Sequence, residues 1–266
     1  MKYLTKTLKI LLIVALYPAF AFCQSNPTFV TASHPYQSIP TGGSVENTGA
    51  ATVDYSSDEL HGICWDGAIP SFAIVHNANQ LTQALDGMNF GLVIDPDIVI
   101  DPRNNNPRNI LISYTVDYDN IPNNNSPTDI RYEVWSYNGA NLTLVLPSSV
   151  VPSNTNYNEQ SNADISISGE VAIVYHNGFN TVINAIPDLQ NPALISQFCL
   201  VELPCITLCQ SNRPDVALVK DPNSNVTKVS VSFVWSEALN SPTFYVSAHT
   251  FNYSIVANNQ GLNCDI

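Results

Sequence analysis

"DPDIVID", residues 95–101, is the phrase that decides the fold of this chain of 266 residues. Two similar phrases follow it, "NADISIS" at 162–168 and "RPDVALV" at 213–219. Each contains an aspartate that precedes alternating or continuous apolar β-formers, as in a β-strand. These aspartates are Asp97, Asp164 and Asp215. Recurrence of one short phrase at long intervals is typical of repeat architectures, so the chain is predicted to be built from repeated β units.

A turn and a second strand follow every copy of the phrase. The second strands are "NILISYTV" from residue 109, "EVAIVYHN" from 170 and "KVSVSFVW" from 228. Proline, asparagine and glycine fill the turns between the two strands, because they favour tight backbone conformations. Further strand-like runs complete about four strands per unit, and a fainter first unit precedes residue 95. We therefore predict an all-β fold: a β-propeller of about four blades or a fragment of a larger one. A pair of β-sandwich domains is the alternative.

The repeated region, residues 48–266, resembles the four-stranded repeats of secreted bacterial β-propellers. The resemblance depends on "PDIVID", "ADISIS" and "PDVALV" at the start of the units. It also depends on an aromatic residue near the end of each second strand, namely Tyr114, Tyr175 or Trp235. The signature motifs of WD40, kelch and sialidase repeats are not present in the sequence, so the resemblance implies a fold and assigns no activity to any residue.

The N-terminus has the pattern of a secretory signal peptide, predicted to span residues 1–23. Three lysines precede an apolar run over residues 10–22 that is too short for a membrane span. Cleavage after Ala21 or after Cys23 fits the pattern. Cleavage after Cys23 makes Gln24 the first residue of the mature protein. Residues 24–47 are rich in Pro, Ser, Thr and Gly and are interpreted as a linker or edge segment. The sequence thus predicts a secreted protein, extracellular or periplasmic, with no transmembrane segment.

The charge balance narrows the possible partners. The chain carries 22 acidic and 9 basic side chains, a formal net charge of −13. Nucleic acids are bound by basic surfaces, so this composition argues against a nucleic-acid partner. We therefore expect the partner to be an unidentified protein or glycan ligand.

Cysteines are expected to form disulfides in an exported chain. Beyond the signal there are five: Cys64, Cys199, Cys205, Cys209 and Cys264. A bond between the cysteines of the first and last units, Cys64 and Cys264, would tie the ends of a propeller together. Pairing within the "CITLC" region around Cys199 to Cys209 is the alternative, and five cysteines leave at least one outside these pairs.

One loop is the candidate metal site. "DYDN" and the Asn-rich stretch after it place Asp117, Asp119 and Asp129 close together in the sequence. Calcium prefers carboxylate and amide oxygens, so this loop is the predicted calcium site. The spacing does not match an EF-hand, and a solvated acidic loop is the alternative. No other cofactor is expected.

The repeated aspartates are candidates for catalytic groups, because paired carboxylates can hydrolyse glycosides. Their recurrence in each unit favours a structural role, in which the carboxylate accepts backbone N–H bonds at a loop-to-strand junction. The leading hypothesis is therefore a secreted, noncatalytic binding or adhesion module. One alternative is a secreted glycan- or peptide-directed hydrolase whose carboxylates converge in a central cleft. A structural component of a surface assembly is the other.

Overall fold

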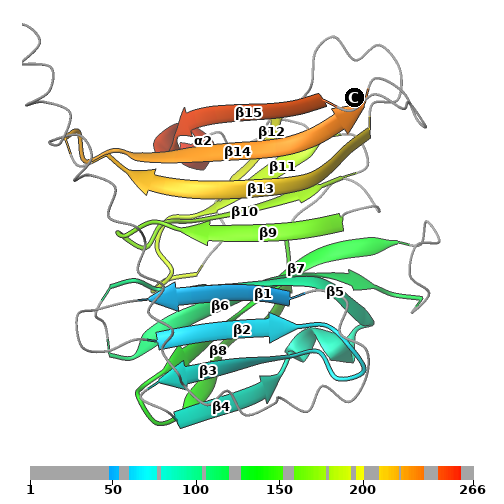
Figure 1. Ribbon diagram of the computed structural model, residues 1–266, viewed down its shortest axis with the longest axis vertical. Coiled ribbons are helices and arrows are strands. Elements are labelled where there is room, and N and C mark those ends of the chain that lie inside the picture. Colours follow the sequence, from blue (N-terminus) through cyan, green and yellow to red (C-terminus); the bar gives the residue numbers. More distant parts are fainter. Residues whose placement is uncertain are drawn as a thin grey trace, which may run out of the picture. The chain divides into compact units, whose positions relative to one another are not determined.

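Four antiparallel sheets follow one another along the chain in the computed structural model of the protein (Figure 1). All four belong to one compact unit, Ile39–Ile266. The structure describes residues 48–53, 60–76, 79–103, 106–119, 127–151, 159–177, 180–192, 196–200, 210–221, 223–236 and 245–258.

The first two sheets contain four strands each, in chain order. The first sheet consists of β1 (Thr48–Val53), β2 (Leu60–Trp65), β3 (Ser71–His76) and β4 (Asn79–Ala84). A short 3-10 helix, η1 (Asp86–Asn89), leads to the second sheet. The second sheet consists of β5 (Leu92–Ile100), β6 (Arg108–Asp117), β7 (Thr128–Tyr137) and β8 (Leu142–Val150).

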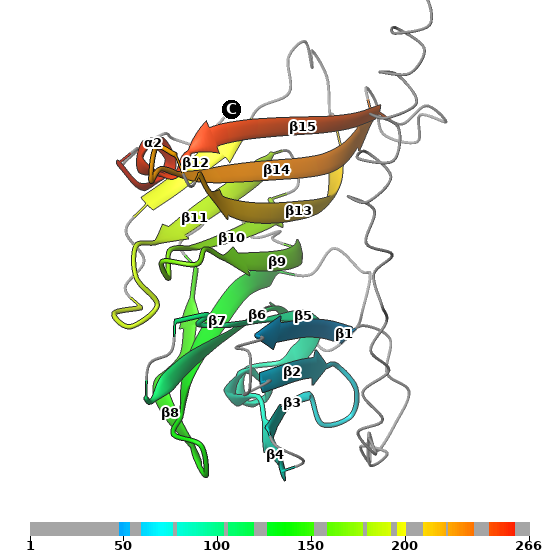
Figure 2. The ribbon, with the colours of Figure 1, turned by 60° about the vertical axis from the view of Figure 1, so that its left-hand side comes forward.

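The third sheet has four strands and the fourth has three among the described residues. The third sheet consists of β9 (Glu159–Ile165), β10 (Val171–His176), β11 (Thr181–Ile186) and β12 (Ser196–Leu200). The fourth consists of β13 (Gln210–Lys220), β14 (Thr227–Ser236) and β15 (Tyr245–Asn252), which the short helix α2 (Tyr253–Asn258) follows (Figure 2).

Each sheet is an up-and-down meander, because every strand pairs antiparallel with its neighbour in the sequence. A meander of about four strands that repeats along the chain is the blade of a β-propeller. With four such sheets among the described residues, this topology confirms the predicted all-β propeller fold, of about four blades or part of a larger propeller. No helix in the described part of the chain is long and apolar enough to cross a membrane.

The blades pack face to face, and this explains the continuous apolar runs in the sequence. Every residue of β6 and every residue of β10 is buried. A strand covered on both faces needs apolar residues at consecutive positions, whereas a strand with one wet face alternates. The runs "NILISYTV" and "VAIVYH" are therefore the middles of blades held between two neighbours.

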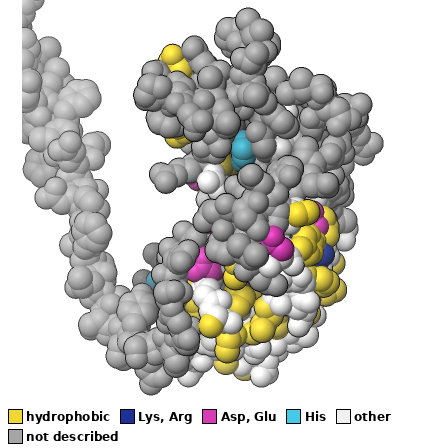
Figure 3. Space-filling view, turned by 90° about the vertical axis from the view of Figure 1, so that its right-hand side faces the viewer, with side chains coloured by type: hydrophobic (Ala, Val, Ile, Leu, Met, Phe, Trp, Pro, Cys, Tyr) yellow, Lys and Arg dark blue, Asp and Glu magenta, His cyan; other side chains and the backbone are white. Residues whose placement is uncertain are grey.

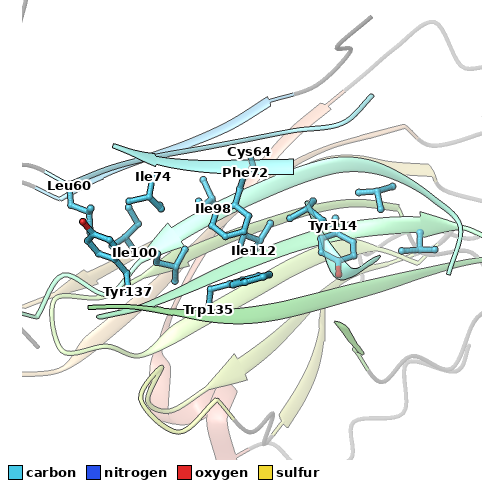
Figure 4. Packing of buried hydrophobic residues seen from close by; sticks show 14 residues of the cluster. Leu60, Cys64, Phe72, Ile74, Ile98, Ile100, Ile112, Tyr114, Trp135 and Tyr137 are labelled. Carbon is cyan, nitrogen blue, oxygen red and sulfur yellow. The ribbon is translucent and has the colours of Figure 1, made fainter. Parts of the chain in front are cut away.

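Three apolar clusters fill the spaces between successive blades. Between the first and second blades, Phe72 and Ile74 meet Ile98, Ile112 and the ring of Trp135 (Figure 4). The Phe72 and Trp135 rings lie 5.3 Å apart with a tilt of 55°, a geometry favourable for aromatic pairs. The second cluster joins blades two and three, and the third joins blades three and four.

The first strand of each blade contacts the first strand of the next. β1 lies against β5, β5 against β9, and β9 against β13. The aspartates of the repeated phrases are on three of these strands, β5, β9 and β13. The blade arrangement therefore gathers residues that are far apart in the sequence along neighbouring strands.

The strand register corrects the alignment of the three phrases. The first strand of each of these blades has a β-bulge in the pairing with its second strand. The first residue to pair after the bulge is Asp97 in β5, Asn162 in β9 and Asp215 in β13. Asp164 is thus two residues beyond the position equivalent to Asp97 and Asp215. A bulge inserts residues that no propensity pattern reveals, so sequence matching aligned the nearest aspartate instead.

The hairpin turns repeat one hydrogen-bonding device. Asp101, Ser166 and Asp221 each close the first hairpin of a blade. In every case a side-chain oxygen of this residue accepts the backbone N–H two residues further along, at 3.0, 3.1 and 2.9 Å. Asp and Ser form such local bonds readily, which is why they recur at this position.

Gly169 lies against the side chain of Arg103, and Gly139 has a similar backbone conformation but no such neighbour. Comparing substitutions at these two glycines therefore tests what Arg103 contributes. Gly169 and Gly139 both have φ near +90°, a conformation that L-residues rarely adopt. A Cβ on Gly139 would contact nothing within 4 Å, whereas a Cβ on Gly169 would lie 2.2 Å from Cζ of Arg103. Asp101 and Asp188 hold this guanidinium with contacts of 2.7 and 2.6 Å.

Gly169→Ala should therefore destabilise the protein more than Gly139→Ala. Both variants lose roughly 1 kcal/mol to backbone strain, and Gly169→Ala loses about 1 to 2 kcal/mol more because Arg103 must move. Urea unfolding of the two variants checks this difference. Equal losses in the two variants would show that Arg103 moves aside at no measurable cost.

Candidate functional site

The aspartates of the repeated phrases bridge neighbouring blades. We refer to Asp97, Asp164 and Asp215 as the inner-strand aspartates. Oδ2 of Asp97, in β5, accepts the backbone N–H of Ala163 in β9 at 2.8 Å. Oδ2 of Asp164 accepts the N–H of Leu218 in β13 at 2.6 Å. The predicted structural role, acceptance of backbone N–H bonds, thus describes what these carboxylates do, although the bonds cross between blades.

These carboxylates are also close enough to influence one another's protonation. The pKa of Asp97 is raised to about 6: burial is the largest cause, the charges of Asp215 and Asp164 add to it, and two backbone N–H bonds oppose it. Burial, together with the charge of Asp215, raises the pKa of Asp164. The blade arrangement therefore brings the three inner-strand aspartates into one electrostatically coupled group.

The inner-strand aspartates differ in exposure. Asp97 and Asp164 are half-buried, and Asp215 is exposed. Oδ1 of Asp215 accepts the N–H of Val216, the next residue in its strand, at 2.9 Å. Backbone bonds thus hold all three carboxyl groups in position, and each of the three retains some contact with solvent.

Two further carboxylates belong to this region, and sequence reasoning missed them. Asp95, two residues before Asp97, has φ of +49° in the bulge of β5. Burial, followed by the nearby charge of Asp66, raises the pKa of Asp95. Gln160, at the equivalent position in the bulge of β9, has φ of +58°, so this backbone conformation belongs to the bulge itself. The second aspartate in "DPD" was the available signal for Asp95, whereas nothing in "CWDG" marks Asp66 as its neighbour.

An acid with a pKa near 6 is chemically useful. It can give up a proton at mildly acidic pH and regain it, which general acid catalysis requires. A second carboxylate nearby can act as a base or nucleophile, and paired carboxylates cleave glycosidic bonds in this way. The group formed by Asp97, Asp164 and Asp215 has the components of such a pair.

The predicted calcium ligands lie at one end of the second blade. Asp117 ends β6 and is buried, and its Oδ1 accepts the N–H of Asp119 at 3.2 Å. The carboxylate of Asp129, in β7, accepts a hydrogen bond from the Tyr118 hydroxyl. Residues 120–126, which complete the predicted loop, lie outside the described residues. Within the described residues, no three His, Cys, Asp or Glu side chains gather closely enough to hold a metal ion.

Calcium binding at this loop stays a prediction. If calcium binds there, millimolar calcium should raise the melting temperature of the protein, because a ligand bound only by the folded state stabilises it. An Asp117→Asn, Asp119→Asn double variant should show a smaller shift. Thermal melts with calcium and with EDTA check this, and equal shifts in the two proteins would remove the idea.

The predicted disulfides also stay predictions. Cys64 is buried in the cluster between the first two blades. Cys199 is in β12, and nothing is described of its side chain. Cys205, Cys209 and Cys264 lie outside the described residues, so the structure tests neither the Cys64–Cys264 bond nor the local alternative.

Comparison with known proteins gives matches of fold. No protein-family model matches the chain, and no curated protein matches its sequence. One similar solved structure is the GH93 α-L-arabinofuranosidase of Fusarium graminearum in complex with arabinobiose. It has 14% identity and a TM-score of 0.48, with 78% of this chain and 62% of that chain covered. A fructofuranosidase from Schwanniomyces occidentalis has 14% identity and a TM-score of 0.40, with coverages of 79% and 44%. The chain thus spans less than two thirds of the length of either structure.

A third similar structure is a thermostable family-43 glycoside hydrolase. It has 13% identity and a TM-score of 0.42, with 79% of this chain and 70% of that chain covered. At these identities the likeness is one of fold, and it transfers no residue role to this chain.

The expectation of a noncatalytic binding or adhesion module is wrong. Four of the similar solved structures are described as an arabinofuranosidase, a fructofuranosidase, a family-43 glycoside hydrolase and an exo-inulinase, all of them enzymes that act on glycosides. In the sequence alone, the recurrence of an aspartate in each unit favours a structural role over catalysis. In the structure, however, that recurrence places carboxylates on neighbouring strands, where their charges interact.

Proposed function

We propose that this chain is a hydrolase of glycosidic bonds that acts at the inner-strand aspartates. One observation carries the proposal: Asp97, Asp164 and Asp215 form a coupled carboxylate group in which the pKa of Asp97 is raised to about 6. Glycosidases need one carboxyl group that donates a proton and another that is ionised. Groups whose surroundings move their pKa values apart are suited to such a division of roles.

Asp97 is the proposed general acid. Its carboxyl group is half-buried and its pKa is raised, so it can hold a proton at mildly acidic pH for donation to the leaving oxygen. Asp215 is exposed, and we assign to it the second role, that of base or nucleophile. Asp164 lies on the strand between these two and contributes to the local negative potential.

The predicted signal peptide supports an exported enzyme. A secreted or periplasmic hydrolase meets polymeric glycans that do not enter cells, so the proposed substrate is a glycan outside the cytoplasm. The strongly negative net charge of −13 favours a neutral glycan over a polyanionic one.

The test is turnover by the purified protein lacking residues 1–23. Aryl glycosides, neutral polysaccharides and peptides form the substrate panel, assayed between pH 4 and 8. Asp97→Asn and Asp215→Asn should each lower kcat by at least about 100-fold, the effect of losing an acid or base. Thermal melts show whether each variant is folded.

Asp221→Asn is the matched control. This carboxylate is partly exposed in a hairpin turn, and an asparagine can still accept the N–H of Asn223. Its turnover should equal that of the original protein. Turnover of peptides but not glycans, no turnover by the folded protein, or unchanged turnover in Asp97→Asn and Asp215→Asn would overturn the proposal.

A further inference from the structure

The second blade carries a buried arginine with aromatic neighbours, and this group does not lie on the strands of the inner-strand aspartates. Arg131, in β7, is 8% exposed, and the ring of Phe90 covers its guanidinium with 3.8 Å between Cζ and the ring centroid. Nη2 of Arg131 is 3.4 Å from the Tyr118 hydroxyl, which in turn donates to the carboxylate of Asp129. We call these four residues, Phe90, Tyr118, Asp129 and Arg131, the Arg131 site.

One edge of the Arg131 guanidinium has donor capacity to spare. Nη1 is engaged by Ser148, with contacts of 3.2 Å to its carbonyl oxygen and 3.4 Å to its hydroxyl. Nε is buried and makes no hydrogen bond in the described structure. The covalent geometry of the fork places Nε–H on the same edge as Nη2, the group that faces Tyr118. Buried polar groups without partners are rare, and a water or a ligand group at this edge would supply the acceptor that Nε lacks.

Large apolar side chains are exposed around this edge. Phe90 is 44% exposed and Tyr118 is 39% exposed. Met88 in η1 is 41% exposed, and Val150, which is opposite Arg131 in the register of β7 and β8, is 43% exposed. The face shown in Figure 3 carries a patch of hydrophobic side chains with acidic ones close by. Exposed apolar surface with convergent polar groups is typical of binding sites.

The residue types favour a neutral sugar over other ligands. Aromatic side chains offer flat apolar surfaces on which the C–H face of a sugar ring can lie. Nη2 of Arg131 and the carboxylate of Asp129 can serve the hydroxyl groups of one ring as donor and acceptor. Asp86 and Glu133 also lie near, since Ser148, Tyr114 and the backbone of η1 connect them to Arg131. These carboxylates repel anionic ligands.

We propose that the Arg131 site binds a residue of a neutral glycan chain and docks that chain on the second blade. The site is built on β7, η1 and the end of β6, whereas the inner-strand aspartates are on β5, β9 and β13. The choice of a glycan ligand rests on the proposed function. The docking itself does not require turnover and can be measured without it.

The experiment is affinity electrophoresis in gels that contain one polysaccharide each. Xylan, arabinan, inulin and mixed-linkage β-glucan are the neutral probes, and polygalacturonate is the anionic one. All proteins carry Asp215→Asn, so that no probe is consumed, and EDTA is present throughout. At least one neutral probe should retard this protein, and Phe90→Ala or Tyr118→Ala should weaken the binding by about tenfold, the effect of losing one aromatic stacking contact.

Two controls make the result specific. Ile167→Ala removes an apolar side chain that is 70% exposed in a hairpin turn of the third blade, and it should leave retardation unchanged. Tyr118→Phe keeps the ring but loses the hydroxyl, and should weaken binding less than Tyr118→Ala. Thermal melts confirm that every variant is folded.

Three results would overturn the docking site. Retardation by neutral probes that Phe90→Ala and Tyr118→Ala leave unchanged would place binding elsewhere. Retardation by polygalacturonate alone would contradict the neutral ligand. A concentration-dependent dimer that Phe90→Ala abolishes, with no retardation by any probe, would make the patch an interface between two copies of the chain. Turnover that is normal while docking fails leaves the proposed function intact.

Discussion

Replacing Glu133 with alanine should lower the free energy of unfolding by about 3 to 5 kcal/mol, a loss expected when a buried charged acceptor is removed from its donors. Glu133 is fully buried in β7. Its Oε1 accepts the indole N–H of Trp135 at 2.7 Å, and its Oε2 accepts the Tyr114 hydroxyl at 2.7 Å and the backbone N–H of Asp86 at 2.9 Å. Alanine leaves the N–H groups of Trp135 and Asp86 inside the protein without this acceptor, whereas the Tyr114 hydroxyl still has Ser148 Oγ at 2.8 Å. It also leaves a cavity between two blades.

Glu133→Gln is the conservative comparison. It fills the same volume and keeps one carbonyl oxygen, but its amide group is a donor where the carboxylate accepted. Its loss should fall between zero and that of Glu133→Ala. Urea unfolding of the three proteins at one pH measures this order. A loss in Glu133→Ala of under about 1 kcal/mol, the worth of a single exposed bond, would show that the donors find other acceptors.

Asp97→Asn should change how stability depends on pH. Burial raises the pKa of Asp97 to about 6 in the folded protein, above the value of 3.8 that is ordinary for an aspartate. The folded state thus binds this proton more tightly than the unfolded state does. The contribution is therefore fully present at low pH, and it is lost as pH rises from about 4 to 6.

The asparagine variant lacks this titration, so the two proteins should diverge across that range. From pH 4 to pH 7, the free energy of unfolding of the original protein should fall by about 2 kcal/mol more than that of Asp97→Asn. The variant also carries a constant loss, because its amide group cannot accept the N–H of Ala163 through the nitrogen. Urea unfolding at pH 4, 5, 6 and 7 separates the two effects. A difference between the proteins that stays the same at every pH would contradict the raised pKa.

The sequence predicted the blades because their cause is local. Alternating and continuous apolar runs, separated by Pro, Asn and Gly turns, dictate strands and hairpins directly. The burial of Glu133 could not be predicted in the same way. In "YEVW" it stands between apolar neighbours and has the pattern of a residue on a wet face. Glu133 is buried because η1 lies against it, and the backbone N–H of Asp86 in η1 donates to its carboxylate. Asp86 is 47 residues away in the sequence.

The candidate site was visible in part. The sequence shows that an aspartate recurs in each unit, at Asp97, Asp164 and Asp215. It does not show that these aspartates come close to one another across neighbouring blades. The bulges that fix the register, and the positive φ of Asp95, depend on pairing with a second strand. The Arg131 site has no sequence signature, because the contact between Phe90 and Arg131 arises only after η1 has packed on β8.

The carboxylate bonds between blades have a consequence for how the molecule opens. The N–H of Ala163, in the third blade, donates to Asp97 in the second blade, and the N–H of Leu218, in the fourth, donates to Asp164 in the third. Each bond therefore breaks when the two blades that it joins separate. Neighbouring blades that share interfaces in this way behave as a linear array with nearest-neighbour coupling. In hydrogen exchange, these two amides report the separation of adjacent blades, whereas amides inside one hairpin report its own fraying.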